Sequence, residues 1–359
     1  MKQFTLRRGG AATATNGADA RPRGGRNAAK LAAAAVLALG LAGGVAACGG
    51  SSSASGGSIA MVGYSTPETV YTDTLEPGFG KTDDGSDVEF SNSFGASGDQ
   101  SRAVEAGQPA DVVHFSTDPD MTRLVDANKV ADDWNQNEYN GYVEDSVVVF
   151  VVRKGNPLGI QTWDDLISSD AEIVTPNPFQ SGSAKWNLMA AYGAKTIGEG
   201  ASDQEGQDFM KQILEQTPVQ PPSGRDATTA FTGGKGDVLL SYENEAIAAQ
   251  NAGEDVDYVI PDDTILIETP IAATTDASDS SQKFIDYQYT DEAQQAWADA
   301  GYRPVVKSVF DKNKDKFPIP SGLFTMEDLG GWDKVNTEFF DPEDSVVQGI
   351  EKDLGVATE

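Results

Sequence analysis

Short apolar runs alternate with stretches of helical spacing through most of the chain. Residues 146–153 are β-branched and almost wholly apolar, which predicts a strand buried on both faces of a sheet. Further strands are predicted at 59–64, 88–93, 111–115, 171–175, 237–242 and 256–260. Helices are predicted at 120–127, 184–197, 204–216, 227–231 and 243–252. Strands that alternate with helices are typical of parallel α/β sheets.

The first 47 residues differ from the rest in charge and hydropathy. They hold seven basic residues and one acid, and they end in an Ala/Leu-rich apolar run over 31–47. A basic segment followed by an apolar run too short for a comfortable membrane span is typical of an export signal. The run leads directly to Cys48, the only cysteine of the chain.

The sequence around this cysteine, Val45-Ala46-Ala47-Cys48-Gly49, resembles the lipobox of bacterial lipoproteins. The resemblance implies that residues 1–47 are a lipoprotein signal peptide and that Cys48 carries the lipid. The mature protein is then expected to be exported and anchored to the outer face of the cell membrane, on the periplasmic or cell-wall side. Residues 49–57 contain only Gly, Ser and Ala, so residues 48–57 are predicted to form a flexible tether.

The composition excludes several kinds of function. The chain has 359 residues, room for about two domains. Beyond residue 47 it carries 19 basic and 55 acidic residues, a net charge of −36, which disfavours binding to nucleic acid. One Cys and one His exclude an internal disulfide, a Cys/His zinc site and a Cys–His nucleophile pair. No metal or cofactor is predicted.

Three Gly/Ser-rich loops, 93–100, 178–186 and 222–226, each lead into a predicted helix. The first N–H groups of a helix are unpaired and carry partial positive charge, Gly allows close approach of a ligand, and Ser adds a hydroxyl. Three such helix starts in one place would bind an anion without a buried cation. The alternative is helix capping, since Ser97 and Gln100 fit a capping box. Spacing alone leaves both interpretations open.

The same loops match the motifs of known enzymes less well than they match an anion site. The sequence around Ser97 lacks the second Gly of a nucleophile elbow, and neither Ser181 nor Ser183 has the spacing to Lys185 of a Ser-x-x-Lys motif. His114, the only histidine, lies in a predicted strand and is expected to pack there. The chain is therefore predicted not to be an enzyme, with a secreted serine hydrolase using Ser97 or Ser181 as the alternative.

Longer motifs then occur in a fixed order: SFGASGDQS (93–101), FVVRKGNP (150–157), TPNP (175–178), SGSAKWN (181–187), GDVLLSYENE (236–245), GYRP (301–304) and LGGW (329–332). With them the chain, from about Ile59 to Lys334, resembles the periplasmic sulfate/thiosulfate-binding proteins of ABC importers, a branch of the type II substrate-binding proteins. The resemblance implies a two-lobe α/β fold with the ligand in the interlobe cleft. Residues 58–149 and 263–359 would form lobe 1, residues 150–262 lobe 2, and residues 147–152 and 264–274 the hinge.

The resemblance also implies a site and partners. Sulfate would be held by backbone N–H groups, a serine hydroxyl and an aromatic side chain. The alternative ligands are other tetrahedral oxyanions: thiosulfate, phosphate or molybdate. The implied contacts are Ser65, Ser97, Ser181, Gly182, Ser183, Gly224, Arg225 and Tyr242. Tyr242 stands where many members have Trp, which leaves the preferred oxyanion open. Asp99 and Asp226 are expected to point along their own helices. The implied partners are integral-membrane permease subunits with a cytoplasmic ATPase, and the protein itself is expected to be a monomer.

Overall fold

The computed structural model describes residues 57–356 and 358. The predicted signal peptide, Cys48 and all of the tether but Gly57 lie outside the described residues. The strands are β1 (Ser58–Tyr64), β2 (Glu89–Gly95), β3 (Val112–His114), β4 (Tyr142–Arg153), β5 (Ile173–Val174), β6 (Val238–Tyr242), β7 (Val256–Val259), β8 (Asp263–Ala273), β9 (Arg303–Pro304) and β10 (Gly322–Phe324).

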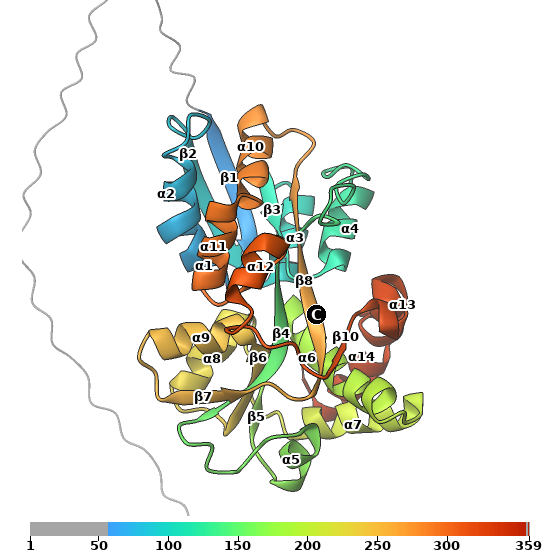
Figure 1. Ribbon diagram of the computed structural model, residues 1–359. Coiled ribbons are helices and arrows are strands. Elements are labelled where there is room, and N and C mark those ends of the chain that lie inside the picture. The colour runs from blue at the N-terminus through green and yellow to red at the C-terminus, as the bar shows by residue number, and fades with distance from the viewer. Residues whose placement is uncertain (1–56, 357, 359) are drawn as a thin grey trace, which may run out of the picture. The chain divides into compact units, whose positions relative to one another are not determined.

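The helices cover both faces of the strands (Figure 1). They are α1 (Glu68–Val70), α2 (Glu76–Phe79), α3 (Ser97–Glu105), α4 (Asp118–Asp126), α5 (Trp163–Ser168), α6 (Gly182–Gly193), α7 (Asp203–Glu215), α8 (Gly224–Thr232), α9 (Glu243–Asn251), α10 (Asp279–Gln288), α11 (Asp291–Asp299), α12 (Lys307–Asn313), α13 (Gly331–Phe339) and α14 (Val346–Leu354). Tyr71–Leu75 and Ala194–Gly198 are π-helical, and Glu327–Leu329 is a 3-10 turn. No helix in this described part is long and apolar enough to cross a membrane.

The sheet is mixed rather than parallel throughout. Its strand order is β2-β1-β3-β8-β4-β6-β5, with β10 paired to β8 and both β7 and β9 paired to β4. The predicted parallel pairing is correct for β1 with β2 and β3, and for β5 with β6. It is wrong for β4 and β8, which pair antiparallel with each other and with β6 and β3 respectively. These two strands cross the molecule in opposite directions, so they cannot be parallel to all their neighbours.

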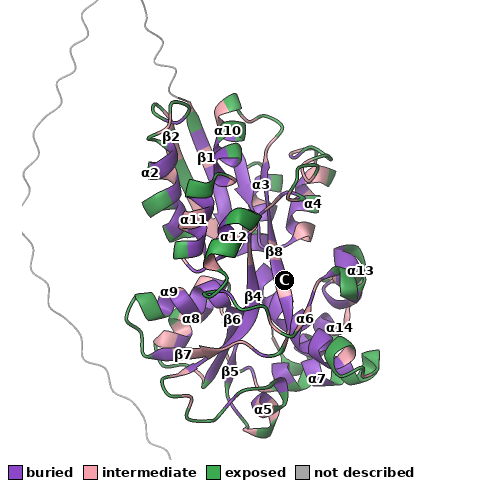
Figure 2. Cartoon of the chain, viewed as in Figure 1, coloured by how far each residue is buried: buried purple, intermediate pink, exposed green. Residues whose placement is uncertain are grey.

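The described chain has two lobes with separate hydrophobic cores, joined by β4 and β8 (Figure 1). In the first lobe, Ile59, Phe284 and Trp297 belong to one core and Phe115 with Leu124 to another. In the second lobe, α6 and α7 pack around a large core, and a smaller one lies under α8 and α9. Figure 2 shows that β4 and α6 are buried through most of their length. Residues Val147–Val152 of β4 are at most 2% exposed, which confirms the predicted double-sided burial.

The division of the chain into residues 58–149 with 263–359 and residues 150–262 stays a prediction. The prediction assigns the last two helices, α13 and α14, to the first lobe, but both pack against the core of the second lobe. Trp332 and Phe339 of α13 and Ile350 of α14 belong to the same core as Trp186 of α6. Trp186 and Trp332 meet edge to face, 4.8 Å apart between ring centroids, as expected for packing residues.

Candidate anion-binding site

Four helix starts converge where the two lobes meet. The starts of α3 and α6 are joined by the N–H of Gly98, which donates to the carbonyl of Gln180 at 3.1 Å. A Cβ placed on Gly224, the first residue of α8, would lie 3.0 Å from Ser183 Oγ, so these two residues are in contact. Tyr242, the N-cap of α9, reaches the first lobe through its hydroxyl. The structure thus brings the loops predicted from their Gly and Ser content to one place.

Ser97 lies at this place but its hydroxyl is already engaged. It donates to Asp120 Oδ2 at 2.7 Å and accepts the N–H of Ser116 at 3.0 Å. The alternative interpretation of Ser97 and Gln100 as a capping box is wrong, because Ala96 is the N-cap of α3 and Gln100 instead accepts from the Ser93 hydroxyl. What Ser97 can offer a ligand is therefore its backbone N–H at the start of α3.

The start of α6 presents the richest set of donors. Ser181 and Ser183 are buried and their hydroxyls are 2.8 Å apart. The N–H groups of Gly182 and Ser183 have no hydrogen-bond partner within the described part of the chain, as expected for the first residues of a helix. Gly182 is required here, since a Cβ on it would lie 2.2 Å from Ser116 Oγ. Backbone donors and two hydroxyls together suit an anion.

Tyr242 meets Ser116 across the lobes, with their hydroxyl oxygens 3.1 Å apart. Both residues are 1% exposed. Burial raises the pKa of the Tyr242 hydroxyl well above its ordinary value, so the group keeps its proton and remains a donor. A donor at this position is what the family resemblance implies, and the contact with an anion stays a prediction.

Ser65 and Arg225 lie beside each other at the edge of this cluster. The N–H of Arg225 donates to Ser65 Oγ at 3.4 Å. The guanidinium is held away by the Thr66 carbonyl at 2.6 Å and by buried Glu245 at 3.1 Å. Its Nε is buried and has no partner among the described residues. Arg225 therefore fixes the start of α8 against the first lobe and retains one free donor.

The two acids that lie next to predicted contacts in the sequence, Asp99 and Asp226, do not face the cluster with a free carboxylate. Asp99 pairs with Arg102 on α3, and Asp226 accepts from Ser223 at the N-cap of α8. Both follow their own helices, as predicted. Asp120, which the sequence did not single out, is 3% exposed and accepts from Ser97 and Thr117. With Arg123 also bonded to it, its acceptor capacity is largely used.

Three contributors were missed from the sequence: Ser116, Thr66 and Asp120. Ser116 and Thr66 follow β3 and β1, and small polar residues at the carboxyl ends of strands are a general signal for a site in α/β proteins. That signal applied equally to Ser65, which was chosen. Asp120 carried no signal, since it looks like an ordinary acid in the first turn of a helix.

His114 packs in β3, as predicted. Its ring nitrogens hydrogen-bond to the hydroxyls of Tyr71 and Thr269, at 2.9 and 3.0 Å. Burial lowers the pKa of His114 to about 3, so the ring is neutral. Its partners are neither Ser97 nor Ser181, and the geometry of a serine hydrolase is not formed in the described chain.

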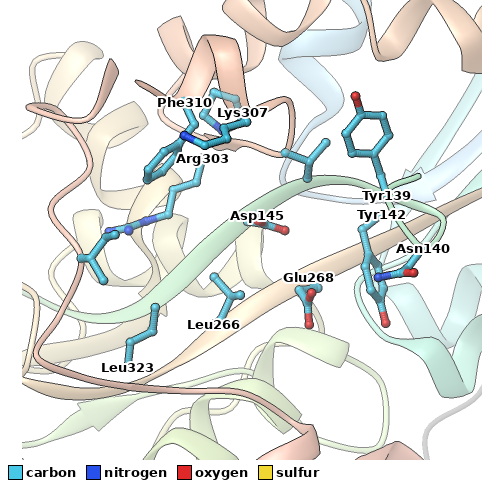
Figure 3. A pocket seen from close by; sticks show the side chains of 13 residues that line it. Tyr139, Asn140, Tyr142, Asp145, Leu266, Glu268, Arg303, Lys307, Phe310 and Leu323 are labelled. Carbon is cyan, nitrogen blue, oxygen red and sulfur yellow. The ribbon is translucent and has the colours of Figure 1, made fainter. Parts of the chain in front are cut away.

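A separate cavity of about 370 Å³ is lined by residues of β4 and β8 (Figure 3). It is lined by Asp145 and Glu268, which are paired across the two strands, and by Arg303 and Phe310. None of the predicted site residues lines it. No cluster of His, Cys, Asp or Glu suited to a metal ion occurs in residues 57–356.

Comparison with known proteins agrees with this fold. Residues 61–303 match the model of the bacterial extracellular solute-binding proteins, and the chain belongs to that family. The relatives are binding proteins, which confirms the prediction of a solute-binding protein rather than an enzyme.

Three relatives illustrate the similarity. The chain is 38% identical over 313 residues to the sulfate-binding protein of Synechococcus elongatus, covering 82% of this chain and 89% of the relative. It is 34% identical to the thiosulfate-binding protein of Escherichia coli, covering 74% and 82%. The structure of the sulfate-binding protein SubI from Mycobacterium tuberculosis is similar with a TM-score of 0.76, at 46% identity, over 79% of this chain and 100% of that one.

Proposed function

We propose that this protein captures sulfate outside the cytoplasm and delivers it to the permease of an ABC importer powered by a cytoplasmic ATPase. The observation that carries the proposal is the buried convergence of the starts of α3, α6 and α8 with the Tyr242 hydroxyl. Relatives named as sulfate-binding proteins, with substantial identity over most of the chain, support the same ligand.

The proposed contacts are donors. They are the N–H groups of Ser65, Ser97, Gly182, Ser183 and Gly224, the hydroxyls of Ser181 and Tyr242, and Arg225 at the edge. Sulfate near neutral pH carries no proton and needs donors only, whereas hydrogen phosphate needs an acceptor for its P–OH. A buried P–OH without an acceptor costs about 1–3 kcal/mol. Thiosulfate is the second candidate, supported by the 34% identical thiosulfate-binding relative.

Isothermal titration with sulfate, thiosulfate, molybdate and phosphate tests the proposal, in buffer free of all four anions. We expect sulfate or thiosulfate to bind most tightly and sulfate to be preferred over phosphate by at least about tenfold at pH 8. Equal or tighter binding of phosphate would replace the sulfate assignment. Absence of binding by all four anions would reject the oxyanion site itself.

We also propose that Cys48 is lipidated and anchors the protein to the outer face of the cell membrane. The lipobox resemblance and the preceding basic and apolar segments support this. The acidic chain that follows, with a net charge of −36, gains nothing from anionic lipid, so the acyl chains alone would provide the attachment.

The predicted lobe boundaries and hinge complete the proposal. We propose that residues 147–152 and 264–274 bend when the lobes separate; the antiparallel pairing of β4 with β8 between the lobes supports this. We propose that the protein acts as a monomer, since both sides of the site come from one chain.

A further inference from the structure

Ser116 lies in the first lobe, where that lobe contacts α6 and the start of α9 of the second lobe. It follows β3, and each of its polar groups is hydrogen-bonded. Its N–H donates to Ser97 Oγ at 3.0 Å, and its carbonyl accepts from Trp186 Nε1 at 2.6 Å. Its hydroxyl is 3.1 Å from that of Tyr242. Two of these three bonds cross between the lobes, to α6 and to the start of α9.

The hydroxyl pair has only two possible arrangements. Within the described residues, Ser116 Oγ has one hydrogen-bond partner, the Tyr242 hydroxyl. If Ser116 donates, the Tyr242 proton is free to point at the ligand. If Tyr242 donates, its oxygen presents only lone pairs. A buried hydroxyl proton is costly to leave unpaired, and the Ser116 proton is paired only when Ser116 donates to Tyr242. That arrangement is therefore favoured.

We propose that Ser116 is a specificity-determining residue of the anion site: by donating to Tyr242 it turns the tyrosine proton toward an unprotonated tetrahedral dianion, and it ties the two lobes together at that point. The inference rests on the proposed function, because it assumes an oxyanion next to Tyr242. It adds a residue and a direction of hydrogen bonding to the site.

The consequence is a change in selectivity rather than only in affinity. With Ser116 present, a lone pair of the Tyr242 oxygen is occupied and its proton faces the anion. Without it, the Tyr242 hydroxyl can rotate and accept from the P–OH of hydrogen phosphate. Ser116→Ala is therefore expected to weaken sulfate by about 2- to 10-fold and phosphate by less, so that the sulfate-to-phosphate ratio falls.

The experiment is a titration of sulfate and phosphate at pH 8 into five proteins: the parent, Ser116→Ala, Tyr242→Phe, the double variant and Ser281→Ala. Ser281 is the matched control, a buried serine of α10 hydrogen-bonded to Ser278. If Ser116 acts through Tyr242, the double variant binds sulfate about as well as Tyr242→Phe alone, and the control matches the parent. Ser116→Cys, with a weaker donor, gives an intermediate ratio and serves if the alanine variant does not fold.

Two results would overturn the inference while leaving the proposed function intact. One is an equal loss of sulfate and phosphate affinity in Ser116→Ala, which would indicate a purely structural role. The other is a double variant whose loss is the product of the two single losses. A parent protein that binds no oxyanion would instead reject the proposed function, and this inference with it.

Discussion

At the scale of single residues, the site relies on hydroxyl and backbone donors and keeps charged side chains occupied elsewhere. Arg225 is paired with Glu245, and Asp120 is bonded to Ser97, Thr117 and Arg123. Donors without a formal charge can stabilise a dianion without leaving a buried charge unpaired when the site is empty. Each donor then contributes a measurable share of the binding free energy.

Tyr242→Phe tests the largest of these shares. If the hydroxyl donates to the anion, its loss should cost roughly 1.5–3 kcal/mol, the range for hydrogen bonds to charged groups. This corresponds to a loss of about 10- to 150-fold in sulfate affinity by isothermal titration. Tyr258→Phe is the control, because Tyr258 lies in β7 away from the site. Unchanged sulfate binding by Tyr242→Phe would place the hydroxyl outside the anion's contacts.

Several residues of the site could be predicted from the sequence, and others could not. The serines and glycines at helix starts were predictable because the loops before α6 and α8 carry local signals. Ser116 was not, because a lone serine after a strand has no motif and gains its role only when β3 meets α6 and α9. The engaged hydroxyl of Ser97 was also unpredictable, since its partner Asp120 belongs to another helix.

At the scale of elements, the glycine at the start of α6 allows the helix to approach the first lobe. The methyl group of Gly182→Ala would lie 2.2 Å from Ser116 Oγ and 2.8 Å from Thr117 Cγ2. Either the start of α6 or Ser116 must move, so the donors no longer converge. We expect a loss of at least about tenfold in sulfate affinity. The measurement is isothermal titration together with circular dichroism to verify the fold.

Gly349→Ala is the matched control for this variant. Gly349 is exposed in α14, and a Cβ there meets no atom within 4 Å. Alanine favours a helix over glycine by about 0.8–1 kcal/mol, so the free energy of unfolding should rise while sulfate binding stays unchanged. Sulfate affinity of Gly182→Ala equal to that of the parent would show that the start of α6 does not contact the ligand.

The sequence predicted where most strands of the sheet lie, but not where each strand begins and ends. The predicted strand at 146–153 begins at Tyr142 in the structure, because polar Glu144 is buried in β4 and accepts from Tyr64 and Thr269. Pattern analysis treats a glutamate as exposed and ends the strand before it. The helices after β8 were not predicted, although α13 and α14 each have an apolar face that helical periodicity could have found.

Buried Glu144 predicts an unusual pH dependence for this part of the fold. Burial raises the pKa of Glu144 and of Glu268 to about 7, and that of Asp118 to about 6. The folded state therefore binds more protons at these groups, and the stability they contribute is present at low pH and lost as pH rises through 6 to 7. His114 acts in the opposite direction, because its lowered pKa removes stability as pH falls below its ordinary value of 6.5.

Burial also raises the pKa of Asp145, so the carboxyls with a raised pKa outnumber the single histidine and favour higher stability at mildly acidic pH. We expect the melting temperature of the ligand-free protein to rise as pH is lowered from 8 to about 5, by roughly 2–4 °C for each kcal/mol gained. Glu144→Gln cannot titrate but keeps an acceptor for Tyr64, so its gain should be smaller. Exposed Glu254→Gln should retain the parent's gain. A melting temperature that falls steadily from pH 8 to 5 would contradict the expectation.

At the scale of the whole molecule, attachment and ligand capture are separate properties. Cys48→Ser should release the protein from membranes, because the folded acidic chain has no attraction of its own to anionic lipid. Ser51→Ala, in the same Gly/Ser segment, should remain attached. The measurement is sedimentation of cell membranes followed by immunoblotting. Cleaved Cys48→Ser protein that still sediments with membranes would exclude lipid anchoring through this residue.

Capture should change the shape of the molecule, because the donors of the site come from both lobes. The proposed contacts Ser65 and Ser97 belong to the first lobe, and Gly182, Gly224 and Tyr242 to the second. An anion that touches both sets binds the closed arrangement more tightly than an open one and shifts the population toward it. Small-angle scattering should therefore give a smaller radius of gyration with saturating sulfate than without it.

The Gly182→Ala variant tests whether the change in radius of gyration is caused by sulfate bound at this site. At a sulfate concentration that saturates the parent but not the variant, only the parent should contract, and the variant should follow when more sulfate is added. Ionic strength is held constant with chloride, because screening of the net charge of −36 would itself change the radius. A parent radius that does not respond to sulfate, in protein shown by titration to bind it, would mean that the lobes are already closed before the anion arrives. The Ser116–Tyr242 and Ser116–Trp186 hydrogen bonds would then hold the lobes together without a ligand.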